Sequence, residues 1–169
     1  MVTAEDTRTA LKILTRAMNI EAEGNKFYLK AAETTADKNG QEMFRRLAGD
    51  EQGHYNLMKQ EYDSLKQEKG WAASPQVQPV SIDLGKPLFP KGINSLKKRI
   101  TDKSSDWDAL LFGLDIEIRS YDLYRNAAAE TADRRGKQAL EFLAEQEMGH
   151  FNTLMMRYDS LFGPISWYD

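Results

Sequence analysis

Two short motifs of glutamate and histidine are the residues in this sequence whose types and spacing could do chemistry. Glu51 precedes His54 by three residues, and Glu147 precedes His150 by the same interval, 96 residues further along the chain. Residues three apart on a helix share one face, so each carboxylate and its imidazole can reach a common point. Both groups are ligands of divalent transition metals. One such pair alone is weak evidence, because Glu-x-x-His also occurs by chance on exposed helix faces.

The two motifs belong to an internal repeat. Alignment of residues 20–65 with residues 116–161 gives 19 identities in 46 positions without a gap. The alignment pairs Glu21 with Glu117, and each of these glutamates falls inside the apolar stripe of a predicted helix. Such a repeat indicates a duplicated helical hairpin. Four carboxylates and two imidazoles are therefore predicted to converge in an interior that is otherwise apolar.

A cluster of this composition needs cations. Burial of one unpaired charge costs several kcal/mol or more, and two divalent metals would neutralise four glutamates. Carboxylate-bridged di-iron and di-manganese bundles use this ligand set. We therefore predict a dinuclear metal site formed by Glu21, Glu51, His54, Glu117, Glu147 and His150. An exposed, solvated charge face and a site that has lost its metal are the alternatives.

Helical periodicity accounts for most of the chain. Apolar or small residues recur every three or four positions in four segments, at 14–32, 43–65, 107–128 and 140–161. Short polar connections with a glycine, at 37–40 and 133–136, separate the members of each pair. Leu161 is expected to be the last buried residue of the fourth stripe. Two such hairpins pack most simply as an all-α four-helix bundle.

The segment between the hairpins, residues 70–104, has a different character. It contains four prolines, which exclude a long helix, although residues 93–100 are compatible with a short one. A connection of this length in a compact domain needs a reason. We interpret it as a crossover between hairpin 1, at about 4–69, and hairpin 2, at about 105–162, within a single domain of residues 1–169.

Composition excludes several classes of function. The net charge of −3 favours neither a nucleic-acid partner nor an anionic membrane. No run of about 18 apolar residues predicts a transmembrane helix, and the first residues lack the features of a secretory signal. Cysteine is absent, which rules out disulfides, thiolate catalysis and cysteine-ligated iron–sulfur centres within these 169 residues. A cytoplasmic location is the default expectation.

Two tyrosines accompany the candidate ligands. Tyr28 and Tyr124 lie seven residues after Glu21 and Glu117, about two turns along the same helix face. Packing of the rings in the core accounts for their position. Each hydroxyl could in addition hydrogen-bond a ligand carboxylate or an oxygen species, as groups around metal ligands do. We therefore keep both tyrosines as candidate catalytic residues.

A glycine precedes each histidine. Gly53 and Gly149 fall inside predicted helices, where glycine costs about 1 kcal/mol relative to alanine. This cost suggests that a neighbouring helix approaches closely at both positions.

The paired motifs resemble those of the rubrerythrin family, which belongs to the ferritin-like superfamily. The resemblance covers roughly residues 10–69 and 105–162, and the motifs that carry it are Glu21-x6-Tyr28, Glu51-Gln52-Gly53-His54, Glu117-x6-Tyr124 and Glu147-Met148-Gly149-His150. It implies a ferritin-like four-helix bundle of two duplicated hairpins joined by a long crossover. It also implies two iron ions. Glu51 and Glu147 would be the bridging carboxylates, and the terminal ligands would be His54, His150, Glu21 and Glu117.

The resemblance implies a redox activity as well. Family members reduce hydrogen peroxide with electrons from a redox partner, and many form dimers, some by exchange of hairpins. Many carry a rubredoxin-like iron domain with four cysteines, a residue type that this chain lacks. We therefore expect a di-iron oxidoreductase that reduces peroxide or dioxygen. Its electrons would come from a separate protein, rubredoxin-like or other, and the chain is expected to form a homodimer.

One departure from the family pattern keeps other functions open. Peroxidase-type members carry an extra glutamate one turn after the third-helix ligand, where this chain has Ser120; the repeat counterpart is Gly24. A ferroxidase or iron-binding role is the first alternative. The second is a catalytically idle interaction module stabilised by zinc or manganese, because carboxylate and imidazole ligands alone do not select iron.

Overall fold

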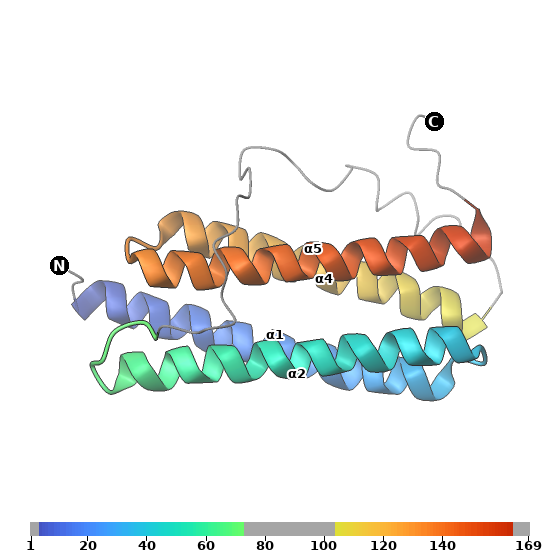
Figure 1. Cartoon of the computed structure of the whole chain (residues 1–169), viewed down its shortest axis with the longest axis horizontal. Helices are drawn as coiled ribbons and strands as arrows, with labels where there is room; N and C mark the ends of the chain where they lie inside the picture. Colours follow the sequence, from blue (N-terminus) through green and yellow to red (C-terminus); the bar gives the residue numbers. More distant parts are fainter. Residues whose placement is uncertain (1–3, 73–103, 164–169) are drawn as a thin grey trace.

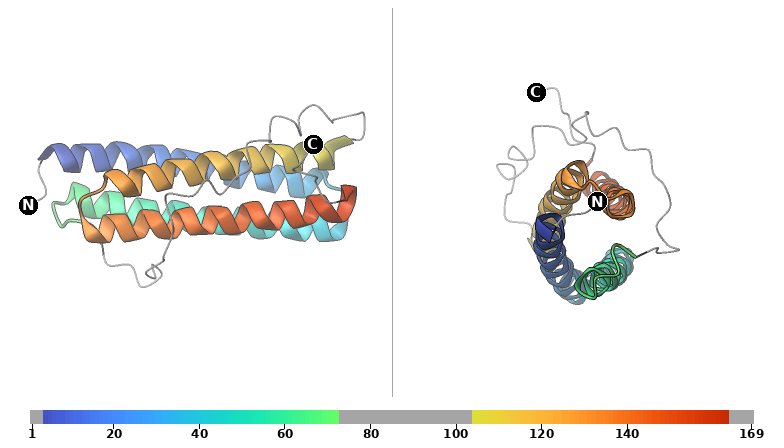
Figure 2. Two further views of the ribbon diagram at one scale, coloured as in Figure 1. Left: turned by 90° about the horizontal axis from the view of Figure 1, so that it is seen from above. Right: turned by 90° about the vertical axis from the view of Figure 1, so that its left-hand side faces the viewer.

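Four long helices form a bundle (Figure 1) in the computed structural model, which describes residues 4–72 and 104–163. The helices are α1 (Ala4–Thr34), α2 (Lys38–Lys66), α4 (Ser104–Glu130) and α5 (Arg134–Phe162). Helices α1 and α2 form one antiparallel hairpin, α4 and α5 form the other, and the two hairpins lie side by side (Figure 2). The predicted all-α, ferritin-like four-helix bundle is confirmed. The short helix expected at 93–100 lies outside the described residues.

Both hairpin turns are shorter than the sequence pattern predicts. The connections expected at 37–40 and 133–136 are placed too late, because α2 begins at Lys38 and α5 begins at Arg134. The aspartate before each helix is its N-cap. Oδ2 of Asp37 accepts a hydrogen bond from the backbone N–H of Gly40 at 2.6 Å. Asp133 caps α5 in the same way. These caps provide hydrogen-bond acceptors for backbone amides that have no partner inside the helix. Each helix therefore begins directly after its aspartate, and its first turn includes the glycine.

Specific contacts join the two hairpins at opposite ends of the bundle. At one end the guanidinium of Arg157 on α5 forms an ion pair with the carboxylate of Asp37, the N-cap of α2. At the other end the ring of Trp71 is 4% exposed and packs against Gly136. A Cβ at position 136 would lie 2.3 Å from that ring, so only glycine leaves room for Trp71.

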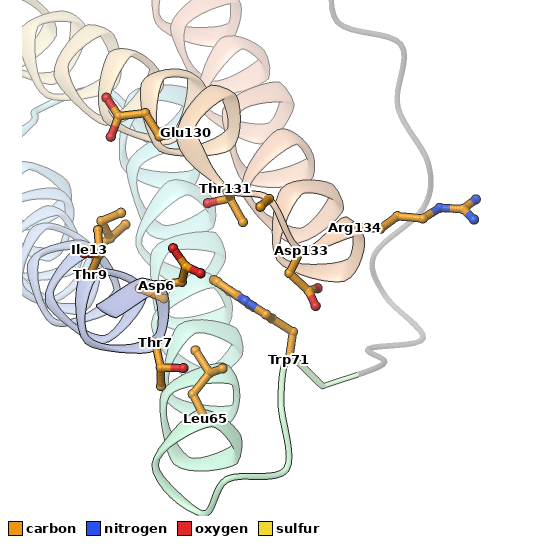
Figure 3. A pocket seen from close by; sticks show the side chains of 12 residues that line it. Asp6, Thr7, Thr9, Ile13, Leu65, Trp71, Glu130, Thr131, Asp133 and Arg134 are labelled. Carbon is orange, nitrogen blue, oxygen red and sulfur yellow. The ribbon is translucent and has the colours of Figure 1, made fainter. Parts of the chain in front are cut away.

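A pocket of about 370 Å³ lies beside Trp71 at this end of the bundle (Figure 3). It is bounded by the first turns of α1 and by the connection between α4 and α5, and Asp6, Glu130 and Asp133 are among its lining residues. None of the six predicted metal ligands lines it. The pocket is therefore separate from the predicted site.

The buried apolar residues form two clusters along the bundle. On α1, for example, Leu14 belongs to one cluster and Tyr28 to the other, and Glu21 lies between them in the sequence. The predicted stripes are mostly buried, but the prediction for Leu161 is wrong, because this residue is 41% exposed in the last turn of α5. Tyr158, one turn earlier, is the last large buried residue of that helix. Among the described residues, no helix has both the length and the apolarity needed to cross a membrane.

Candidate metal centre

All six predicted metal-ligating residues meet in the interior of the bundle, and every helix contributes to them. Helices α1 and α4 each provide one glutamate, whereas α2 and α5 each provide a glutamate and a histidine. The four glutamates are at most 2% exposed and the two histidines are 6% exposed. The residues are Glu21, Glu51, His54, Glu117, Glu147 and His150.

The donor atoms form two overlapping groups of four residues, in each of which the ligand atoms all lie within 4.8 Å of one another. Glu51 and Glu147 belong to both groups. Glu21 and His54 complete one group, and Glu117 and His150 complete the other. Two neighbouring cation sites that share two carboxylates need this arrangement of ligands.

In the first group, the imidazole of His54 faces the carboxylates through Nδ1. This nitrogen lies 3.1 Å from Oε1 of Glu147 and 3.4 Å from Oε2 of Glu21. It lies 3.9 Å from Oε2 of Glu51, three residues earlier on the same helix. The helical spacing of the motif therefore brings its carboxylate and imidazole to one point, together with ligands from two other helices.

The second group repeats this geometry. Nδ1 of His150 lies 3.3 Å from Oε1 of Glu51 and 3.4 Å from Oε2 of Glu117. The rings of His54 and His150 stack with their centroids 5.3 Å apart and their planes inclined by 21°. The two imidazoles therefore lie side by side, each directed at its own carboxylate group.

The atoms that face the centre of this cluster lack hydrogen-bond partners. Seven buried atoms of the six residues are in this position: Oε2 of Glu21, Oε1 of Glu51, Nδ1 of His54, Oε2 of Glu117, both carboxylate oxygens of Glu147, and Nδ1 of His150. A buried polar atom without a partner costs about 1–3 kcal/mol, and most such atoms in proteins are paired. Cations held by the two groups would satisfy them, so the residues fit a dinuclear metal centre.

Two tyrosines orient the remaining carboxylates across the hairpin boundary. The hydroxyl of Tyr28 on α1 donates a hydrogen bond to Oε1 of Glu117 on α4. The hydroxyl of Tyr124 on α4 donates in turn to Oε1 of Glu21 on α1. Both tyrosines are fully buried. Each bond occupies one carboxylate oxygen and leaves the other, Oε2, directed at the cluster.

Burial and mutual repulsion change the acidity of the shared carboxylates. Burial, together with the neighbouring charge of Glu21, raises the pKa of Glu51 and of Glu147 well above the usual glutamate value. Burial also acts to raise the pKa of Glu21, but its close contacts with Glu51 and His54 outweigh burial and lower that pKa. Without metal, the shared carboxylates therefore bind protons more readily than Glu21 does.

The pKa values of the groups around the carboxylates shift in the directions that a negatively charged cluster produces. Burial acts to lower the pKa of His150, but the carboxylates of Asp50, Glu117 and Glu51 raise it to about 12. Burial and the carboxylate that each hydroxyl faces raise the pKa of Tyr28 and of Tyr124 well above the usual value. Both hydroxyls therefore remain protonated donors at neutral pH.

Asp50 is a site residue that the motifs do not predict. Its Oδ2 lies 3.5 Å from Nε2 of His150, on the side of the imidazole opposite the carboxylate cluster. A carboxylate in this position orients a ligating histidine and increases its basicity. The repeat offers no signal for it, because residue 146, the counterpart of Asp50, is glutamine. The contact depends on how α2 lies against α5, which sequence spacing does not give.

The predicted close approach of helices at Gly53 and Gly149 is wrong. Both glycines are exposed, and a Cβ placed on either would meet no atom within 4 Å. Two residues after a core glutamate, a helical position points away from the core. The close approach is instead at Gly24, where a Cβ would lie 3.3 Å from Cδ of Glu51.

A family model described as Rubrerythrin matches residues 12–158. The chain belongs to the rubrerythrin family. The match spans both hairpins and includes all six candidate ligands of this rubrerythrin-family chain.

A solved structure supports the assignment of the fold. A hypothetical protein from Pyrococcus furiosus superposes on this rubrerythrin-family chain with a TM-score of 0.66 and 21% sequence identity, and the match covers 93% of each chain. At this identity the likeness shows the shared fold alone. No curated protein matches the sequence.

Proposed function

We propose that this chain is a di-iron oxidoreductase of rubrerythrin type, which reduces hydrogen peroxide or dioxygen with electrons from a separate protein. One observation carries the proposal. Seven buried donor atoms, from the two Glu-x-x-His motifs and from Glu21 and Glu117, converge without hydrogen-bond partners. Family membership favours iron over zinc or manganese as the native metal.

The chain's own residues would perform three tasks at the centre. Glu51 and Glu147, which belong to both donor groups, would hold the two ions together, and each imidazole with its own terminal glutamate would complete one site. Bound iron would supply the electrons and the Lewis acidity that cleavage of an O–O bond requires. The buried position of the ligands excludes bulk water, which strengthens each electrostatic interaction within the site.

Tyr28 and Tyr124 would fix the terminal carboxylates and keep a proton at each hydroxyl. Each hydroxyl donates to a glutamate of the other hairpin, so it holds that carboxylate in one orientation. The chain has no cysteine for an iron–sulfur centre of its own. The electrons are therefore assigned to a separate donor protein.

Rapid mixing tests the proposed activity. The iron-loaded, reduced protein is mixed with hydrogen peroxide, and formation of the oxidised centre is followed by absorbance. We expect oxidation faster than that of the same concentration of free ferrous iron, and loss of this advantage in Glu147→Gln. The matched control is Glu145→Gln, which removes a carboxylate from the exposed face of α5. A wild-type rate equal to that of free iron would contradict the proposal.

A ferroxidase or iron-binding role is the second candidate, and Ser120 favours it. This side chain is 1% exposed and stands where peroxidase-type relatives are expected to carry an additional carboxylate. The buried position therefore has a hydroxyl and no charged group that could become a ligand. Mineral storage needs an assembled shell, so a sizing column separates the candidates. A large assembly would favour storage, whereas a dimer would favour the oxidoreductase.

A further inference from the structure

A groove of about 680 Å³ lies between α1 and α4. These two helices are neighbours in the bundle (Figure 2). We name this groove the α1–α4 groove. Branched apolar side chains line it from both helices, and charged side chains of both signs accompany them. The apolar lining residues are Ile13, Ile20, Ile116 and Leu123, and the charged ones are Arg16, Glu23, Arg119, Asp122 and Glu130.

Gly24 connects this groove to the candidate metal centre. It is buried and lines the groove. A Cβ at this position would lie 3.3 Å from Cδ of Glu51 and 3.5 Å from its Oε2. Position 24 therefore contributes no side chain between the groove and a carboxylate that belongs to both donor groups. Any larger residue would place atoms against that carboxylate.

We propose that the α1–α4 groove is the route by which a small uncharged molecule, of the size of hydrogen peroxide or dioxygen, reaches the centre, and that Gly24 sets the size limit. The proposal rests on the proposed function, for which it supplies the path of the oxidant. The isoleucine and leucine side chains of the groove suit a neutral molecule, and Gly24 places no side chain between the groove and Glu51.

The opposite face of the cluster has a different character. There the stacked rings of His54 and His150 lie over the carboxylates, and Asp50 places a further negative charge beside His150. That face suits a cation better than a neutral oxidant. The α1–α4 groove, which has apolar lining residues on both helices, is thus the better path for a neutral oxidant.

Nitric oxide is a suitable probe, because it is small and uncharged, binds ferrous iron reversibly and needs no turnover. Its association and dissociation rates are measured by stopped flow on the iron-loaded, reduced protein. The variants are Gly24→Ala and Gly24→Val, together with Ile20→Trp, which narrows the groove one turn from Gly24. Gly49→Val is the matched control, since a Cβ at that exposed helical position meets no atom within 4 Å.

A narrower entrance changes the association and dissociation rates of nitric oxide by the same factor and leaves its Kd unchanged. We expect Gly24→Val and Ile20→Trp to slow association and dissociation together by about tenfold, which corresponds to about 1.4 kcal/mol of added barrier. In Ile20→Trp the Kd for nitric oxide and the spectrum of the centre should stay as in the wild type, and Gly24→Ala should slow both rates less than Gly24→Val does. Gly49→Val should match the wild type.

Two outcomes would overturn the proposal. Unchanged association rates in both Gly24→Val and Ile20→Trp would mean that ligands enter elsewhere. A changed Kd or spectrum in Gly24→Ala, with Ile20→Trp like the wild type, would mean that Gly24 positions Glu51 and does not control entry. Failure of the wild type to bind iron is a different result, because it would contradict the proposed function itself.

Discussion

Removal of metal should make the stability of this protein steeply dependent on pH. The reason is the cluster of four buried carboxylates, which only two imidazoles accompany. In the metal-free fold, the pKa of Glu51 and of Glu147 is raised well above 4.5, and that of His150 is raised from 6.5 to about 12. A group with a higher pKa in the folded state contributes stability below its unfolded pKa and loses it as the pH rises towards the folded value.

The slope of stability against pH depends on how many more protons the metal-free fold binds than the unfolded chain. In the metal-free fold His150 keeps its proton from about pH 6 to 8, whereas an unfolded histidine loses it over this range. The raised pKa of Glu51 and of Glu147 makes the fold bind more of their protons than the unfolded chain does, in which glutamates are ionised. Glu21, with its lowered pKa, is ionised in both states there and adds nothing. Each extra proton contributes about 1.4 kcal/mol per pH unit, so His150 alone gives a fall that approaches about 1.4 kcal/mol per unit, and the two carboxylates make the fall steeper. Such a slope is large against a typical total stability of about 5–15 kcal/mol.

Urea unfolding at pH 6, 7 and 8, followed by circular dichroism, measures this slope in protein treated with a chelator and in protein loaded with iron. The loaded protein should show a flat profile, because metal ligands are already deprotonated. Metal binding near pH 7 should release protons, the one on His150 included, which an indicator dye counts in weak buffer. A metal-free protein whose free energy of unfolding stays level or rises from pH 6 to 8 would refute the reasoning.

Three substitutions test individual contacts and positions by the same unfolding assay. Tyr28→Phe removes a buried hydrogen bond to the carboxylate of Glu117 and should cost about 1.5–3 kcal/mol in the metal-free protein, so a change below about 0.5 kcal/mol would count against that bond. Gly136→Ala places a Cβ 2.3 Å from the Trp71 ring and should cost about 1–3 kcal/mol. Gly49→Ala, in open space on the exposed face of α2, should instead gain up to about 1 kcal/mol, and equal effects of the two alanines would contradict the packing of Trp71.

The convergence of the six residues could be predicted because the three-residue spacing within each motif agrees with the internal repeat of the chain. Spacing by three places Glu51 beside His54 on one helix face, and the repeat places the same pair on a second hairpin. Glu21 lies on the apolar stripe of the partner helix, where only a core position was available to it. Residue type and helix register are therefore enough to predict most residues of the candidate site.

Features that depend on contacts between helices could not be predicted in this way. Asp50 reaches His150 only because of how α2 lies against α5, and its repeat counterpart is not acidic. The glycine prediction failed for a different reason, because it used only the cost of glycine in a helix and not the helix register. Gly53 lies two residues after the core residue Glu51 and faces away from the core, whereas Gly24 lies three residues after Glu21 and faces Glu51 on another helix.

The metal content of the protein, purified without added metal, tests the central claim most directly. We expect about two metal ions per chain, mostly iron, and a near-complete loss of both when Glu51 and Glu147 are replaced by glutamine together. Metal content near zero after reconstitution with ferrous iron, or a content that the double substitution leaves unchanged, would contradict the assignment of the buried cluster as a dinuclear centre.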